Sequence, residues 1–156
     1  MLSFISSLPP WLVVLLISML PFIELRGAIP AGILVLHMDP LSVFIIAVIG
    51  NLIPVPFILI LFEKVERWLR RYEFWTGLMD RIFEKTRNKA SKKVEEYEAL
   101  ALVLFVAIPL PGTGAWTGAL IAYLFGLDIK KSLFYIAVGV VMAGFAVTLI
   151  STGGHL

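Results

Sequence analysis

Glu24 and Arg26 are the two residues of this 156-residue chain whose types and position could do chemistry. Both lie in segment 21–30 (PFIELRGAIP), inside a long apolar zone. A charge at the centre of a bilayer costs roughly 2.5–3.5 kcal/mol on insertion scales, so two neighbouring charges indicate a function. Glu24 could exchange a proton or bind a cation, and Arg26 could hold an anion such as phosphate or keep Glu24 ionised. The alternative is an ion pair that only stabilises the fold.

A glycine-rich turn in segment 109–118 (PLPGTGAWTG) is the predicted partner of these two charges. Its glycines leave backbone N–H groups unshielded, just before a helix predicted to begin near Ala115. A helix N-terminus carries partial positive charge and favours an anion or a carboxylate. The alternative is a tight turn that needs glycine only for its geometry. The predicted substrate- or ion-binding residues are Glu24, Arg26, Asn51, Gly112, Thr113, Gly114 and Thr117, and the predicted helix breakers are Pro21, Pro30, Pro109 and Pro111.

The composition excludes several classes of protein. Apolar residues make up 60% of the chain and charged residues 15%, against roughly 25% charged in a soluble domain. This indicates an integral membrane protein rather than a disordered chain or a nucleic-acid binder. The chain has no cysteine and only two histidines, His37 and His155, so we expect no disulfide, metal site or cofactor. We find no order of residues typical of an enzyme and no P-loop.

The lengths of the apolar runs predict two membrane-spanning helices, at 41–62 and 133–151. A span needs about 20 residues. The other runs, near 11–20, 28–37, 100–108 and 116–126, are half as long and reach only about the midplane. Asn51 lies within the first long run, where we expect an interhelical hydrogen bond or a contact with substrate.

The two apolar zones also resemble each other, which predicts an internal duplication. A proline-glycine cluster, an aspartate and a glycine recur in the same order, with Pro21 matching Pro109 and Gly50 matching Gly139. Each pair of half-length runs could form a hairpin that enters and leaves on one side, or one broken helix that crosses. The hairpins place every Lys and Arg except Arg26 on one face, as the positive-inside rule favours.

The predicted fold is therefore an all-α integral membrane protein with an inverted-topology repeat. Each repeat is a re-entrant helical hairpin plus one transmembrane helix: hairpin 11–37 and helix 41–62 in repeat 1 (1–62), hairpin 100–126 and helix 133–151 in repeat 2 (99–156). Region 63–98 between them is predicted to be cytoplasmic. It holds an amphipathic helix near 65–83, which lies at the membrane interface or packs on the protein, and a polar connector. The two proline-glycine breaks should meet near the midplane and shelter a polar site.

Segments 21–32 (PFIELRGAIPAG) and 109–119 (PLPGTGAWTGA) together resemble a family of small prokaryotic membrane proteins known as small multidrug export proteins. The resemblance covers nearly the whole chain. The family is similar to the DedA/VTT superfamily, which is associated with two facing re-entrant hairpins and with moving lipids or lipid-linked phosphates. The resemblance implies functional roles for Glu24, Arg26, Pro109, Pro111, Gly112 and Gly114. Unlike the DedA pattern, the second motif of this chain has no arginine.

Three functions remain open from the sequence. The first is a secondary transporter of small molecules or drugs in a prokaryotic cell membrane, with Glu24 as coupling carboxylate and a proton or cation as coupling ion. The second is a DedA-like flippase or scramblase of lipid phosphates, and the third is a membrane scaffold that transports nothing. We expect a homodimer, because two full spans make a small bundle. The other expected partners are the lipid bilayer and the substrate, and no nucleic acid.

Overall fold

The computed structural model describes residues 8–69, 71–72, 76–77, 80, 92–110, 112–124 and 126–153. Within these residues the chain is helical and contains no strand, which confirms the predicted all-α class. The elements in chain order are α2 (Pro10–Met19), α3 (Glu24–Pro30), the π-helix η1 (Ala31–Val35), α4 (Pro40–Leu52), α5 (Pro54–Leu69), α7 (Lys92–Ala107), α8 (Ala115–Leu124) and α9 (Ile129–Ser151).

Two apolar helices are long enough to cross a membrane, Pro40–Val65 and Ile129–Ser151. Both agree with the predicted spans. The first consists of α4 and most of α5, which are separated only at Ile53, directly before Pro54. A proline inside a helix removes one backbone hydrogen bond, so Pro54 accounts for the interruption. The predicted amphipathic helix is only partly visible, because most of its residues beyond Leu69 lie outside the described residues.

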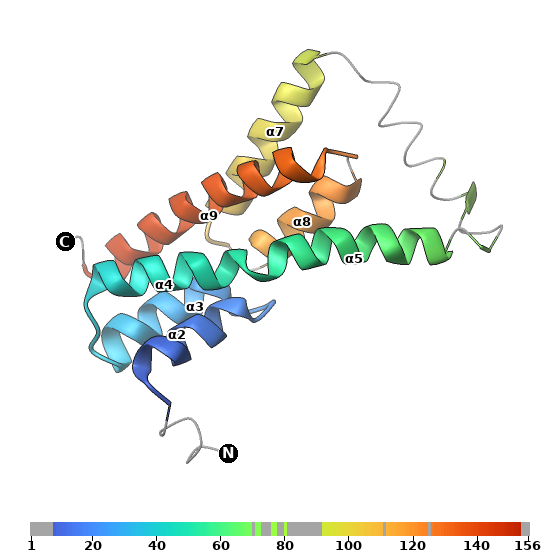
Figure 1. The fold of residues 1–156 in the computed structure, drawn as a ribbon. Helices are drawn as coiled ribbons and strands as arrows, with labels where there is room; N and C mark the ends of the chain where they lie inside the picture. Colours follow the sequence, from blue (N-terminus) through green and yellow to red (C-terminus); the bar gives the residue numbers. More distant parts are fainter. Residues whose placement is uncertain are drawn as a thin grey trace.

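The remaining helices form two hairpins that point in opposite directions (Figure 1). Helix α2 runs from the end of the molecule where α4 begins to about its middle, and α3 with η1 returns to that same end. Helix α7 begins at the opposite end, near the start of α9, and α8 returns there after a turn in the middle. We call residues 20–26 the first tip and residues 108–114 the second tip. Glu24, Leu25 and Gly114 are the buried residues among the described parts of the two tips, whereas Phe22 and residues 108–110 are exposed.

Glycines allow each long helix to approach the first helix of its own hairpin. A Cβ at Gly50 of α4 would lie 2.7 Å from the carbonyl oxygen of Leu15 in α2. A Cβ at Gly139 of α9 would lie 2.8 Å from the carbonyl oxygen of Val103 in α7. Leu15 and Val103 are 88 positions apart, the same offset that relates Pro21 to Pro109. The same close packing therefore occurs at positions that the sequence pairs.

Aspartates begin both long helices, as expected for helix caps. The Asp39 carboxylate accepts hydrogen bonds from the backbone N–H of Ser42 at 2.9 Å and from its hydroxyl at 3.0 Å. The Asp128 carboxylate accepts from the N–H of Lys130 at 2.9 Å. Each side chain supplies an acceptor to a first-turn N–H that has no partner within the helix.

The core between the hairpins and the long helices is formed by small and branched side chains. Helix α3 packs on α4 and α9, α8 packs on α5 and α9, and α2 and α7 pack on α4 and α9 respectively. The largest apolar side chains that are fully buried are Val14, Leu25, Ile29, Val43, Val55, Leu102, Val106, Ile136 and Val140. This core holds the two tips against each other.

Candidate functional site

The Glu24 carboxyl group lies at the centre of the contact between the tips. Only 3% of Glu24 is exposed. Its Oε1 accepts a hydrogen bond of 3.3 Å from the backbone N–H of Trp116, in the first turn of α8. Gly114 closes the other side, since a Cβ there would overlap Oε2 and lie 2.7 Å from Cδ of Glu24. The first tip thus places a carboxylate at a helix N-terminus, which is where a negative charge is favoured.

The backbone at Glu24 is unusual. Its φ is +51°, in the left-handed region that non-glycine residues rarely adopt. Such a conformation costs of order 1–3 kcal/mol and persists only where the surroundings impose it. Here it follows the turn after Pro21 and begins α3, and it directs the side chain towards α8. The break at Pro21 therefore orients Glu24 as well as ending α2.

Arg26 contacts the turn that connects α7 to α8. Its guanidinium donates to the carbonyl oxygens of Ile108 at 3.2 Å, of Thr113 at 2.7 Å and of Leu110. It also donates to the Thr113 hydroxyl at 2.7 Å. These carbonyl oxygens belong to the turn between α7 and α8, where Ile108 also accepts from the Leu110 N–H and Leu110 from the Thr113 N–H. A guanidinium, with five donors, satisfies several of them at once.

Glu24 and Arg26 therefore contact the second tip rather than each other. Among the described residues, Glu24 and Arg26 form hydrogen bonds with the start of α8 and with the second tip respectively, and no ion pair within 4 Å with each other. The carboxylate lies at the N-terminus of α8, where the helix dipole favours a negative charge. The guanidinium lies on carbonyl oxygens of the turn between α7 and α8. The sequence patterns predicted a carboxylate such as that of Glu24 at this helix N-terminus, but they did not predict the contacts of Arg26 with carbonyl oxygens of the turn.

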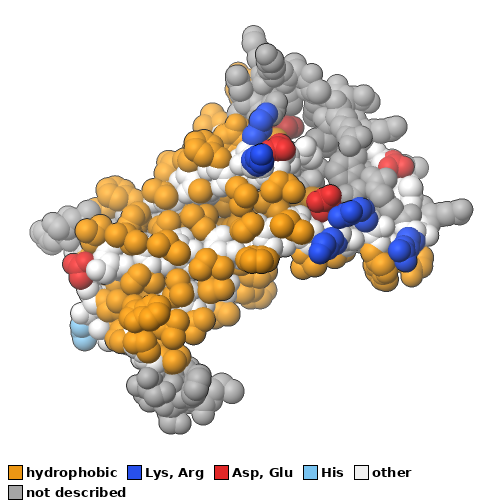
Figure 2. Space-filling view, in the orientation of Figure 1, with side chains coloured by type: hydrophobic (Ala, Val, Ile, Leu, Met, Phe, Trp, Pro, Cys, Tyr) orange, Lys and Arg blue, Asp and Glu red, His pale blue; other side chains and the backbone are white. Residues whose placement is uncertain are grey.

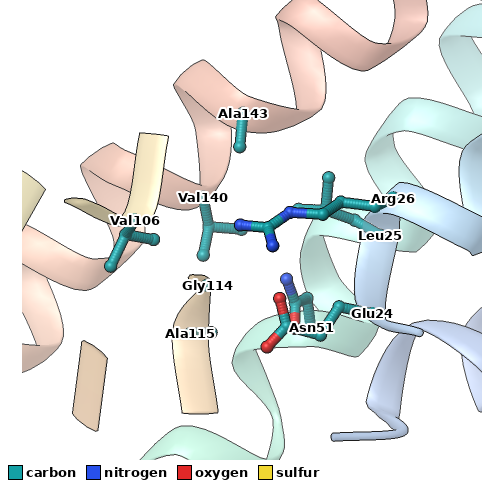
Figure 3. A pocket seen from close by; sticks show the side chains of 9 residues that line it. All are labelled: Glu24, Leu25, Arg26, Asn51, Val106, Gly114, Ala115, Val140 and Ala143. Atoms are coloured by element: carbon teal, nitrogen blue, oxygen red, sulfur yellow. The ribbon is translucent and has the colours of Figure 1, made fainter. Parts of the chain in front are cut away.

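Asn51 completes the polar site from α4. It is 1% exposed, and it lines the same cavity as Glu24. Figure 3 shows the Asn51 amide beside the Glu24 carboxylate, with the Arg26 guanidinium between these two residues and α9. The cavity here has an empty volume of about 140 Å³. It is lined by Glu24, Leu25, Arg26, Asn51, Val106, Gly114, Ala115, Val140 and Ala143. The side chains of the site are therefore closely packed.

Three buried side-chain atoms without a hydrogen-bond partner occur in the described part of the chain, and all belong to residues around this site. They are Nε of Arg26, Oδ1 of Asn51 and Nε1 of Trp116. A buried polar atom without a partner costs about 1–3 kcal/mol. These two donors and one acceptor can therefore gain hydrogen-bond partners when the protonation state or the packing at the tips changes.

Five of the predicted site residues are brought together: Glu24, Arg26, Asn51, Thr113 and Gly114. Gly112 is exposed, with open space where a Cβ would be, although its φ of +83° explains the glycine. Thr117 lies half-buried within α8 and does not line the cavity. Pro111 lies outside the described residues.

The prolines predicted to break helices also differ in what the structure shows. Helix α2 ends at Met19 before Pro21, and α7 ends at Ala107 before Pro109, as predicted. The prediction of a break at Pro30 is wrong. Pro30 is the last residue of α3, and the helix continues as η1 with a hydrogen bond from the Leu36 N–H to the Ala31 oxygen. Pro30 therefore marks the change from an α-helix to a π-helix and does not end the helical segment.

The sequence analysis missed the backbone N–H of Trp116 and the walls formed by Val106, Val140 and Ala143. The N–H carries no sequence signal beyond its place in the first turn of a helix. The apolar walls come from α7 and α9 and could not be assigned before the packing was known. No group of three or more His, Cys, Asp or Glu side chains that could hold a metal occurs among the residues that the structure describes.

Comparison with known proteins agrees with this description. A family described as "Putative small multi-drug export protein" matches residues 24–146, which include Glu24, Arg26, the second tip, α3, α4, α5, α7, α8 and most of α9. No curated protein and no solved structure matches the chain. Together with the two apolar helices of spanning length, the family match indicates a membrane protein.

Proposed function

The chain belongs to the small multi-drug export protein family, and we propose that it is a secondary transporter whose site lies between the two tips. The observation that carries this proposal is the buried Glu24 carboxyl group, which lies where two oppositely directed hairpins meet. Transporters of this general design bind substrate and coupling ion where broken helices meet at the midplane. The cargo class is the one in the family's description, small drug-like molecules.

In the proposed topology both hairpins are re-entrant. Helices α2 and α8 have ten residues each, or about 15 Å of helix, half of the roughly 30 Å hydrocarbon core. Figure 2 shows Lys and Arg gathered at one end of the molecule, with apolar side chains over its middle. The positive-inside rule places that end, with region 63–98, in the cytoplasm. His37 and Asp39 then lie on the outer side.

An inverted repeat follows from this topology. The equivalent contacts of Gly50 with α2 and of Gly139 with α7 support it. The repeats differ in charge: the first tip supplies Glu24 and Arg26, and the second tip with the start of α8 supplies the backbone groups that receive them. In such a design, rocking of one repeat against the other exposes the site to each side in turn.

We propose the proton as the coupling ion. The groups facing the Glu24 carboxylate are N–H donors: the backbone of α8 and the Asn51 amide. A sodium ion needs several oxygen ligands around it, and the cavity, with about 140 Å³ of empty volume, is small for such a shell. A proton needs no such shell. The Asn51 amide can also serve both protonation states, because it donates to a carboxylate and accepts from a carboxylic acid.

Protonation of Glu24 would then weaken the contact between the two tips. The ionised carboxylate is stabilised by the N-terminus of α8, and neutral Glu24 loses most of that interaction. Arg26 still holds the second tip but no longer faces a nearby negative charge. A protonated Glu24 therefore favours separation of the tips, which opens the site, and deprotonation favours their closure. The opened site would present one carboxylate within an apolar wall, which suits lipophilic cations.

The test is flux in proteoliposomes. Wild type should move a lipophilic cation such as tetraphenylphosphonium down an imposed pH gradient, and a sodium gradient should have no effect. Glu24→Gln should abolish coupled flux while keeping the fold, because the amide resembles the protonated acid. Glu63→Gln, a matched change at an exposed carboxylate on α5, should transport like wild type. Folded Glu24→Gln protein with wild-type coupled flux would overturn the proposal.

The same liposomes separate the two alternatives. If lipid-phosphate movement survives in Glu24→Gln but is lost in Arg26→Ala, the protein is a DedA-like flippase or scramblase. That function requires Arg26 to leave the carbonyl oxygens it now satisfies. If neither cargo moves and both variants unfold, the protein is a scaffold and the two charges are structural. The contacts of Arg26 with the second tip are the observation that favours the scaffold.

We further propose that the protein is a homodimer. Large apolar side chains cover the outer face of α9, including Phe134, Val141, Met142 and Phe145. They can face lipid or a second copy. Cross-linking in native membranes through a cysteine at Val141 should trap a dimer, and a chain that stays monomeric there would remove this part of the proposal.

A further inference from the structure

The far end of α5 carries a second feature that the transport site does not use. An open hollow of about 570 Å³ of empty volume is lined by Lys64, Arg67, Trp68 and Arg71. These residues recur at three- and four-residue spacing and therefore share one side of the helix. Helix α5 ends at Leu69, and the Arg71 N–H donates to the Trp68 oxygen at 3.3 Å, which keeps Arg71 beside the hollow.

The charge of this hollow is strongly positive. Three of its four residues are cationic, and Arg67 has one carboxylate partner, Glu63, at 3.7 Å. That pair is open to solvent, with 66% of the Arg67 side chain and 51% of the Glu63 side chain exposed. Within the described part of the chain, Lys64 and Arg71 have no carboxylate within 4 Å. The hollow therefore has unused capacity to bind an anion.

The position of the hollow along the helix sets its depth in the membrane. The apolar span ends at Val65, directly after Lys64, and α5 continues to Leu69, four residues or about 6 Å of helix later. The headgroup region extends about 5–8 Å beyond the hydrocarbon on each side. Trp68 and Tyr72 are each 54% exposed and in edge-to-face contact, as is typical of aromatic side chains at a membrane interface. Lys64 therefore lies at the edge of the hydrocarbon and Arg67 at the level of the headgroups, and Arg71 follows the end of the helix on the headgroup side.

We propose that this hollow binds the phosphodiester headgroup of an anionic membrane lipid such as phosphatidylglycerol. The guanidinium groups of Arg67 and Arg71 match phosphate oxygens in pairs, and Lys64 adds a point charge. Trp68 lies at the wall, where it contacts the glycerol and upper acyl region of the same lipid. The site fixes the end of the α4–α5 helix at the inner surface of the bilayer, whatever cargo the protein moves.

The test is native mass spectrometry of the full chain released from nanodiscs of equal phosphatidylglycerol and phosphatidylcholine. Wild type should retain one phosphatidylglycerol per chain under conditions that strip other lipids. Arg67→Gln/Arg71→Gln should lower the affinity about 30-fold, from about fivefold per removed charge near the surface. Arg67→Lys/Arg71→Lys should restore part of the binding. Lys130→Gln/Lys131→Gln, a matched pair of cations at the start of α9, should retain the lipid.

A second measurement reports on the site itself. Phosphatidylglycerol brominated near the headgroup should quench tryptophan fluorescence more than brominated phosphatidylcholine does, and Trp68→Phe should remove the difference. Inorganic phosphate at millimolar concentration should not displace the lipid; if it does, the ligand is free phosphate. Retention of phosphatidylglycerol by the Gln/Gln variant at wild-type level overturns the proposal. Equal loss in the Lys130/Lys131 control does the same, because the attraction is then non-specific.

Discussion

The contact between the two tips can be tested by substituting two glycines of the second tip. Gly112 and Gly114 both have positive φ, +83° and +124°, so alanine at either position strains the backbone. They differ in their surroundings. A Cβ at Gly112 meets no atom within 4 Å, whereas a Cβ at Gly114 overlaps the Glu24 carboxylate. Comparing Gly112→Ala with Gly114→Ala therefore separates the cost of the backbone from the cost of displacing Glu24.

The expected magnitudes follow from these contacts. Gly112→Ala should lower the free energy of unfolding by about 1–2 kcal/mol, the cost of placing a Cβ at positive φ. Gly114→Ala carries a similar backbone cost. It must also move the Glu24 carboxylate away from the Trp116 N–H, and a hydrogen bond to a charged group is worth about 1.5–3 kcal/mol. Gly114→Ala should therefore cost about 1.5–3 kcal/mol more than Gly112→Ala.

The assay is reversible unfolding in mixed micelles, followed by helical circular dichroism, for both variants and for each combined with Glu24→Ala. Once the carboxylate is absent, the extra cost of Gly114→Ala should disappear, so the two glycine variants become equal. Equal destabilisation by both glycine variants in the wild-type background would refute the contact. So would an extra cost of Gly114→Ala that persists without Glu24.

Three further predictions test other parts of the structure. Arg26→Lys keeps the charge but loses the forked donor set, so the free energy of unfolding should fall by about 1–3 kcal/mol; an unchanged value would contradict the role of these contacts. Hydrogen bonds from the Ser42 backbone and hydroxyl hold the pKa of Asp39 below its usual range. The cap therefore stabilises α4 above the pKa of Asp39 in the unfolded chain and is lost as the pH falls through the folded value, and Asp39→Asn should remove this part of the acid dependence in a circular dichroism titration. Cysteines at His37 and Lys130 should react with an impermeant reagent from opposite sides of the membrane, and labelling from one side would remove the proposed topology.

Several features of the fold could be predicted from the sequence because they depend on local chemistry. Asp39 and Asp128 each stand before a long apolar run, where an aspartate accepts first-turn N–H groups, and both do so. Pro21 and Pro109 end helices because proline excludes the backbone pattern that a continuing helix needs. The two long apolar runs were expected to be long helices, because a helix pairs its backbone N–H and C=O groups within the segment, as lipid requires.

Other features depend on packing and were not predictable in this way. Pro30 has the same local chemistry as Pro21, yet the helical backbone continues past it as the π-helix η1. The partners of Arg26 are carbonyl oxygens more than 80 residues away in the chain. One signal was available: a helix that ends at a proline leaves carbonyls without donors, and Arg26 is the one arginine outside region 63–98.

The spacing of Glu24 and Arg26 now has a physical explanation. Side chains two positions apart point in different directions, which rules out a mutual contact on a helix but suits two targets on opposite sides. Here the targets are both in the second hairpin: the N-terminus of α8, which favours a carboxylate, and carbonyl oxygens of the preceding turn, which accept from the guanidinium. The contact of Glu24 with α8 is strongest while Glu24 is ionised, whereas the contacts of Arg26 do not require that charge. A structural role for Arg26 and a coupling role for Glu24 are therefore compatible, because neutralising the carboxyl group weakens one contact between the hairpins and leaves the other.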